Sequence, residues 1–155
     1  MISNVNEFIW IKEEIIKISQ KHNINKIRIG AMIENVEIAN DADMLAKEVD
    51  FLSIGTNDLT ESITGLSRET NSIEFQQLNN EVKDTIKEII YRARSSKNDI
   101  VIGICGEHSN YIENIQFYSN IGVNYVTCSP EFVKPNKEYL NFDKNNQIKV
   151  VNKRK

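Results

Sequence analysis

Apolar residues recur at helical spacing in two long stretches of the chain. The first stretch places them three and four residues apart, at Phe8, Ile11, Ile15 and Ile18. This spacing predicts a helix over residues 6–21, and we expect Trp10 to lie in the core together with that face. The second stretch predicts a long amphipathic helix over residues 74–94. Shorter patterns of the same kind predict helices over residues 37–47 and 111–121.

Short runs rich in Ile and Val alternate with these helices and predict strands. The runs are residues 26–34, 49–54, 100–105 and 123–128. Strands that are apolar throughout and separated by helices are typical of parallel sheets, so the pattern predicts an α/β sheet or barrel. Residues 55–72 are polar and contain two glycines, which predicts a long loop of the kind that often carries function.

The residues after the last predicted strand break this alternation. Pro130 and Pro135 argue against a helix there, because proline removes a backbone donor and clashes with the preceding helical turn. Residues 140–151 predict at most one further short element, and the pattern does not place it.

Polar groups with useful chemistry follow each predicted strand. They are Glu34, Asn57 with Asp58, Cys105 with Glu107, and Cys128 with Ser129. In parallel α/β folds, ligands gather at the carboxyl ends of the strands. The repeated placement of these groups therefore predicts a site at that edge of the sheet.

Glu34 and Asp58 are two carboxylates from neighbouring strand ends. Mg²⁺ typically takes one or two protein carboxylates and leaves its other positions to substrate and water, which suits this pair. Each residue also has a simpler explanation, because Glu34 is typical of the start of a helix and Asp58 of a turn or N-cap. The glycine-led turn over residues 55–58 offers backbone amides that favour a carboxylate or phosphate oxygen.

Cys105 has two competing interpretations. Free cysteine is often a buried core residue, whereas a thiol with a pKa near its usual value of about 8.5 is a plausible proton donor near neutral pH. Gly103 and Gly106 would allow a backbone or ligand to approach closely. His108 would orient this thiol, relay a proton, or lie solvated in a loop. Cys128 is expected to be a core residue.

Composition and charge limit the classes of function. The chain has 155 residues, 40% of them hydrophobic, and a net charge of −3, which fits one globular domain and does not suggest a nucleic-acid surface. No apolar run approaches the roughly 18–20 residues needed to cross a bilayer, so we expect no membrane segment. The two cysteines lack close-spaced partners, which favours free thiols and a cytoplasmic location.

A set of short motifs resembles a known enzyme family. The motifs are GAMIE (30–34), DFLSIGTNDLTE (50–61), GLSRE (65–69), IGICGEH (102–108) and VTCSP (126–130). Their order and spacing resemble the C-terminal phosphoenolpyruvate (PEP)/pyruvate-binding barrel of the PEP-utilising phosphotransferases. Within that family they look most like pyruvate, phosphate dikinase.

The resemblance implies a fold and a reaction. Residues 1–130 would form part of a (βα)₈ TIM barrel, roughly strands five to eight with their helices, followed by a divergent tail at 131–155. The reaction would transfer a phosphoryl group between a phosphohistidine domain and the enolate of pyruvate, with Mg²⁺ as cofactor.

The resemblance also implies roles for individual residues. Glu34 and Asp58 would hold Mg²⁺, and Cys105 would be the acid–base group that moves a proton to or from the methyl carbon of pyruvate. The substrate-binding residues would be Thr56, Asn57, Asp58 and Gly106.

The chain also departs from the family pattern. Asn35 and Glu37 stand where the family usually has valine and arginine, and Glu61 replaces a glutamine. The resemblance further implies that the other barrel half and the phosphohistidine and nucleotide-binding domains lie on another chain or are lost. We therefore expect negligible dikinase turnover from this chain alone.

Three alternatives stay open. Two copies of the chain would associate edge to edge as a homodimer. The chain would be a non-catalytic half-barrel that serves as a subunit, a binding module or a gene relic. Or it would belong to a different Mg²⁺-dependent barrel that acts on keto acids by enolate chemistry.

Overall fold

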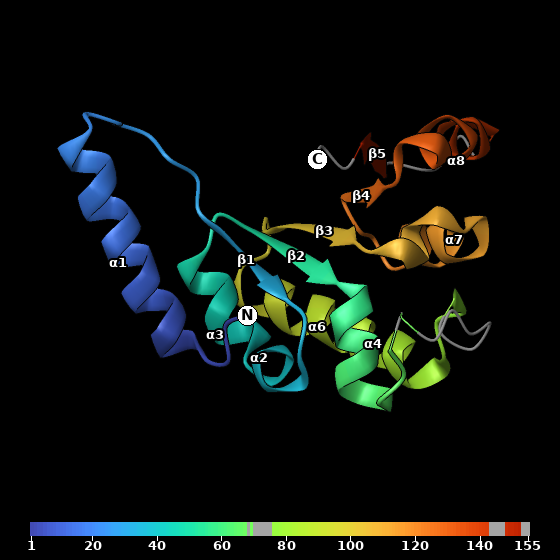
Figure 1. Cartoon of the computed structure of the whole chain (residues 1–155), viewed down its shortest axis with the longest axis horizontal. Helices are drawn as coiled ribbons and strands as arrows, with labels where there is room; N and C mark the ends of the chain where they lie inside the picture. Colours follow the sequence, from blue (N-terminus) through green and yellow to red (C-terminus); the bar gives the residue numbers. More distant parts are fainter. Residues whose placement is uncertain (68, 70–75, 143–147, 153–155) are drawn as a thin grey trace.

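In the described part of the chain, five parallel strands form a single sheet in chain order (Figure 1). The computed structural model describes all residues except 68, 70–75, 143–147 and 153–155. The strands are β1 (Gly30–Ile33), β2 (Phe51–Gly55), β3 (Val101–Cys105), β4 (Tyr125–Cys128) and β5 (Lys149–Asn152). Every neighbouring pair is parallel, which confirms the predicted α/β class. The sheet has one strand more than we predicted, because residues 149–152 pair with β4.

Helices connect the strands. They are α1 (Val5–Lys21), α2 (Val36–Asn40), α3 (Ala42–Glu48), α4 (Thr56–Thr64), α6 (Asn80–Ser96), the 3₁₀ helix η2 (Glu107–Asn110), α7 (Ile112–Asn120) and α8 (Pro130–Phe142). Asparagine caps three of them. The side chains of Asn4, Asn35 and Asn79 each accept a hydrogen bond from a backbone N–H in the first turn of α1, α2 and α6. Such caps satisfy donors that a helix start leaves unpaired.

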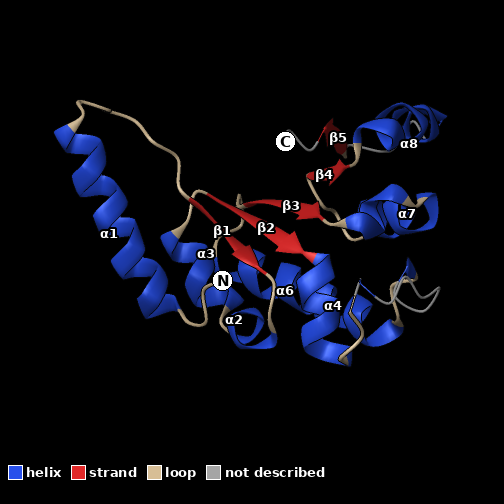
Figure 2. Ribbon diagram, viewed as in Figure 1, coloured by secondary structure: helices blue, strands red, loops and turns tan. Residues whose placement is uncertain are grey.

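One face of the sheet forms the core. Its side chains include Ile33, Ile54, Ile104 and Val126, and each of these four is fully buried. Helices α2, α3, α4 and α6 gather on one side of β1 to β3 (Figure 2). The apolar stripe of α6 completes this packing with Val82, Ile86, Ile89 and Ala93. The side chains of this face are apolar because the helices cover it.

The opposite face, here called the open face, carries side chains that are only half-buried or exposed. Its members are Met32, Phe51, Ser53, Val101, Cys105, Tyr125, Thr127, Lys149 and Val151. Glycine on one strand makes room for a ring from the next. A Cβ added at Gly103 would overlap the Tyr125 ring, and one at Gly30 would overlap the Phe51 ring.

The structure corrects the long loop predicted at 55–72. Residues Thr56–Thr64 form α4, which ends at Gly65 in the left-handed region with φ 71°. Thr, Asn and Asp are weak helix formers, but α4 is held because Leu59 is fully buried. Arg68 of the same segment lies outside the described residues, as do residues 74 and 75 of the predicted long helix.

The prediction that prolines prevent a helix after β4 was wrong. Pro130 is the first residue of α8, a position where the missing N–H would be unpaired in any case. Pro135 lies inside the helix without ending it. Residues 37–47 also differ from prediction, because Asp41 separates α2 from α3.

Trp10 is not a core residue. Its side chain is 63% exposed, and Ile18 of the same helix is 57% exposed. Helix α1 instead buries Phe8 and is tied to the end of α3 by Lys12, whose Nζ donates to the Glu48 carbonyl at 2.6 Å. Within the described part of the chain, no helix combines the length and apolar character needed to cross a membrane.

The Gly103–Tyr125 contact can be tested by Gly103→Ala. The added methyl overlaps the ring, so we expect a loss of unfolding free energy of about 1–3 kcal/mol, measured by urea unfolding. The Tyr125→Ala background lacks the ring that clashes. Adding Gly103→Ala to that background should therefore cost less unfolding free energy than it costs in the unaltered chain. Equal losses in both backgrounds would contradict the proposed overlap.

Candidate functional site

Three predicted site residues lie at the carboxyl end of consecutive strands. Glu34 directly follows β1, Asp58 lies in the first turn of α4 after β2, and Cys105 is the last residue of β3. The parallel register pairs Ile33 with Ile54 and Gly55 with Cys105. Because the strands end level with one another, these groups reach the same edge of the sheet.

Glu34 lies across Gly55 and interacts with Asp58. A methyl group at Gly55 would be 3.2 Å from Oε2 of Glu34. The glycine therefore gives the carboxylate enough room at this position. Burial, and next the negative charge of Asp58, raise the pKa of Glu34 above its usual range. The two carboxylates therefore repel one another electrostatically, as expected of a pair that a cation would bring together.

The donor set fits Mg²⁺ that is shared with a substrate. Among the described residues, no group of three His, Cys, Asp or Glu side chains is placed to hold a metal ion. Mg²⁺ commonly binds through one or two carboxylates and keeps its other positions for substrate oxygens and water. Glu34 and Asp58 meet that requirement without a third protein ligand.

Asn57 links the ends of β2 and β3. Its side-chain oxygen accepts a hydrogen bond from the Glu107 backbone N–H at 2.9 Å. This bond leaves the amide NH₂ group of Asn57 as the donor for another partner. Gly106 has φ 134°, and a Cβ there would overlap Thr56 Oγ1. Only glycine allows these two loops to approach so closely.

Thr56 and His108 lie under the loop that follows β3 and hold it through buried side-chain contacts. Both are fully buried, so the solvated position considered for His108 is wrong. Thr56 Oγ1 lies 3.2 Å from the Cys105 carbonyl, to which it donates, and 3.0 Å from His108 Nδ1. Because the hydroxyl has a single proton, His108 must donate from Nδ1 when Thr56 donates to Cys105. The Thr56 side chain thus makes its hydrogen bonds within the protein.

Asparagine side chains fix the same loop further out. Asn114 Nδ2 donates to the His108 carbonyl at 3.0 Å, and Asn136 Nδ2 donates to the Ser109 carbonyl at 2.9 Å. The Ser129 backbone N–H donates to Asn110 at 3.0 Å, which ties the loop to the end of β4. These buried and partly buried hydrogen bonds hold the residues after Cys105 in one conformation.

Cys128, by contrast, is a core residue as predicted. Its side chain is 1% exposed and belongs to the covered face of the sheet. Burial is the main cause that raises the pKa of its thiol. A buried thiol with a raised pKa is unreactive.

Ser53 and Tyr125 are neighbours of Cys105 that the sequence analysis missed. Ser53 Oγ donates to Cys105 Sγ at 3.4 Å. Burial, then the charge of Cys105, raise the pKa of Tyr125, while a hydrogen bond with Ser53 opposes the rise. The alternation along β2 and β4 places both on the face of Cys105, but that they are its neighbours depends on the register between strands.

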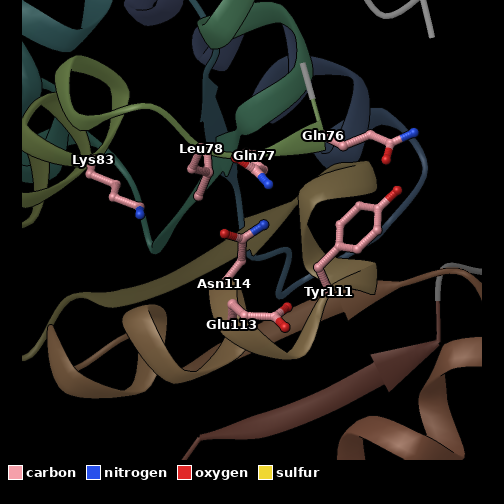
Figure 3. A pocket seen from close by; sticks show the side chains of 7 residues that line it. All are labelled: Gln76, Gln77, Leu78, Lys83, Tyr111, Glu113 and Asn114. Carbon is pink, nitrogen blue, oxygen red and sulfur yellow. The ribbon is translucent and has the colours of Figure 1, made fainter. Parts of the chain in front are cut away.

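The structure also has a cavity near the start of α7. A cavity of about 370 Å³ is lined by Gln76, Gln77, Leu78, Lys83, Tyr111, Glu113 and Asn114 (Figure 3). It lies between the start of α6 and the start of α7, and it shares only Asn114 with the hydrogen bonds described above. None of the predicted site residues lines it.

Comparison with known proteins identifies similar sequences. The chain matches the family model of the PEP-utilising enzyme, PEP-binding domain, over residues 1–143. It is 35% identical to a pyruvate, phosphate dikinase of Treponema pallidum, over 76% of this chain and 14% of that protein. It is also 35% identical to one of Rickettsia typhi, over 84% of this chain and 17% of that protein. The chain thus spans about a sixth of the length of these relatives.

The carboxylate pair can be tested by Asp58→Asn. Removal of the neighbouring negative charge should lower the pKa of Glu34, measured by NMR titration of its side-chain carboxyl carbon. Glu61→Gln is the matched control, because it removes a charge from the same helix and Glu61 is not among the causes of the shift. An unchanged Glu34 midpoint in Asp58→Asn would mean that the two groups are not coupled.

Proposed function

Because the chain belongs to the PEP-binding domain family of the PEP-utilising enzymes, we propose that it binds PEP and pyruvate together with Mg²⁺. The observation that carries the proposal is the placement of Glu34, Asp58 and Cys105 at one edge of the sheet. Two carboxylates can hold a metal ion that stabilises an enolate, and a thiol can act as the acid–base group for its carbon.

Each residue has a distinct part in the proposed binding. Glu34 and Asp58 would hold Mg²⁺, and bound Mg²⁺ would neutralise negative charge that develops on the keto oxygen of pyruvate. The free amide NH₂ group of Asn57 would donate to a carboxylate or phosphate oxygen. The backbone N–H of Thr56 would donate in the same way, and Gly106 would keep this space open.

Cys105 would move the proton. In the direction of PEP formation its thiolate takes a proton from the methyl carbon, and the electrons of that C–H bond pass to the keto oxygen. The oxygen then bonds to phosphorus as the P–N bond of a phosphohistidine breaks. In the reverse direction the thiol returns its proton to the same carbon. The phosphohistidine would belong to another part of the enzyme.

The open face and the two sheet edges support a larger assembly. A (βα)₈ barrel encloses one face of its sheet, and this chain leaves that face half-buried or exposed. We propose that β1 to β4 are the last four strands of such a barrel. Another polypeptide segment would then cover Met32 and Tyr125 and complete the barrel.

A non-catalytic open sheet is the second candidate, and β5 favours it. In a closed barrel that ends with β4, the first strand would pair with the edge of β4. Here β5 occupies that edge, pairing Tyr125 with Lys149 and Thr127 with Val151. It lies beyond residue 143, where the family match ends. In this candidate, the chain's own C-terminal strand closes the edge and prevents completion of the barrel.

Mg²⁺-dependent binding of oxalate, an analogue of the pyruvate enolate, tests the proposed site. We expect calorimetry to detect binding only with Mg²⁺ present, and Glu34→Gln to weaken it about tenfold or more. Binding should also weaken as the pH falls through the raised pKa of Glu34, because the protonated carboxyl is a poor ligand. Glu37→Gln, a charge change three residues away on α2, should bind normally. Unchanged affinity in Glu34→Gln would mean that Glu34 does not take part in the proposed binding site.

The role of β5 can be tested by Val151→Pro. The Lys149 N–H donates to the Asn124 carbonyl just before β4, and alternate residues of a parallel strand face the same neighbour, so the Val151 N–H also faces β4. The substitution removes that donor, so β5 should detach from β4. If β5 blocks completion, this variant should bind the preceding half of the PEP-binding domain from the Treponema pallidum relative about tenfold more tightly than the unaltered chain. Val151→Thr keeps its N–H and serves as control. Equal binding by all three chains would show that β5 is no barrier.

A further inference from the structure

We propose that the cavity between the starts of α6 and α7 binds a small zwitterion of about the size of a dipeptide. The ligand would carry an ammonium group at one end, a carboxylate at the other and polar groups between them. None of the residues proposed to bind PEP or Mg²⁺ lines this cavity, so the inference does not rest on the proposed function.

Opposite charges line the two sides of the cavity. Lys83 belongs to α6 and Glu113 to the first turn of α7, and they are the charged residues of the lining. Figure 3 shows Lys83 on one side and Glu113 with Tyr111 on the other. Within the described part of the chain, neither Lys83 nor Glu113 forms an ion pair. Each can therefore attract a ligand group of the opposite sign.

The α7 side of the cavity suits an ammonium group. Glu113 supplies a carboxylate, and the half-buried ring of Tyr111 supplies an aromatic face, which attracts cations. Helix capping does not explain this tyrosine. Tyr111 is the N-cap residue of α7, but its side chain makes no capping hydrogen bond, and tyrosine is not among the residues that favour an N-cap. A role in the cavity accounts for a ring at this position.

The α6 side of the cavity suits a carboxylate. The ammonium group of Lys83 offers three hydrogen-bond donors together with its positive charge, and such charge-assisted bonds are the stronger ones. The side chain is half-buried, and its Nζ lies 5.7 Å from the centre of the Phe117 ring. This contact with α7 holds the ammonium group beside the cavity.

Amide side chains lie between the two charges. Figure 3 shows Gln77 and Asn114 in this middle position. An amide both donates and accepts hydrogen bonds, as a peptide group does, so these side chains suit the middle of a dipeptide. Asn114 is 6% exposed, and its Nδ2 donates to the His108 carbonyl at 3.0 Å. The bound ligand would thus contact a side chain that also holds the loop after β3.

The size of the cavity limits the ligand. Its volume is about 370 Å³, near the lower end of the roughly 300–1,000 Å³ that ligand sites span. A dipeptide is small enough for this space. A ligand with charge of one sign only would be repelled by either Lys83 or Glu113, which favours a zwitterion.

Glycylglycine is the probe that tests this site. It is added to the full chain without Mg²⁺, and binding is followed by NMR. We expect saturable shifts of the backbone amide signals of Tyr111 and Asn114. N-acetylglycylglycine lacks the ammonium group and glycylglycinamide lacks the carboxylate, so each should bind about tenfold or more weakly than glycylglycine.

Charge variants identify the residues that bind the probe. Lys83→Gln and Glu113→Gln should each weaken glycylglycine binding about tenfold. Lys87→Gln and Glu81→Gln are matched controls, because they remove the same charges from exposed positions of α6 that do not line the cavity. Absence of saturable shifts, equal binding of the three peptides, or full binding by Lys83→Gln would overturn the proposal. Oxalate binding with Mg²⁺ is measured separately, so failure of one site leaves the other standing.

Discussion

The parallel register of β1, β2 and β3 is the constraint on which the candidate site depends. Pairing of Ile33 with Ile54, and of Gly55 with Cys105, makes the three strands end level with one another. A shift of one residue in any strand would turn its side chains to the other face. The buried isoleucines prevent such a shift, because it would expose them to solvent. Core packing thus holds Glu34, Asp58 and Cys105 at a common edge.

Buried polar contacts then give the strand ends their detailed shape. Thr56 joins the Cys105 carbonyl to His108, and Asn114 holds the carbonyl of His108 in turn. Glycine allows these segments to approach, most closely at Gly106. The repulsion between Glu34 and Asp58 works against folding. Two half-buried like charges cost stability, and a bound cation would offset that cost.

Much of this arrangement could be predicted from the sequence, and the misses have physical causes. The apolar runs indicated the parallel α/β class, and the motifs indicated the PEP-binding domain family, which the comparison confirms. Helix α4 was missed because burial of Leu59 overrides the weak helix propensity of its polar residues. Trp10 was wrongly placed in the core, since spacing alone does not show which face finds a partner. The Ser53–Cys105 contact depends on cross-strand register, which periodicity within one strand cannot supply.

Paramagnetic broadening by Mn²⁺, a substitute for Mg²⁺, tests the central claim most directly. The claim is that Glu34 and Asp58 hold one divalent ion at the carboxyl ends of the strands, with Cys105 near it. At substoichiometric Mn²⁺, the amide signals of these three residues should broaden together. The signals of Gly30 and Val101, the first residues of β1 and β3 at the opposite end of the strands, should stay sharp. Broadening that spreads over the acidic helix surfaces, or that spares Cys105, would contradict the account.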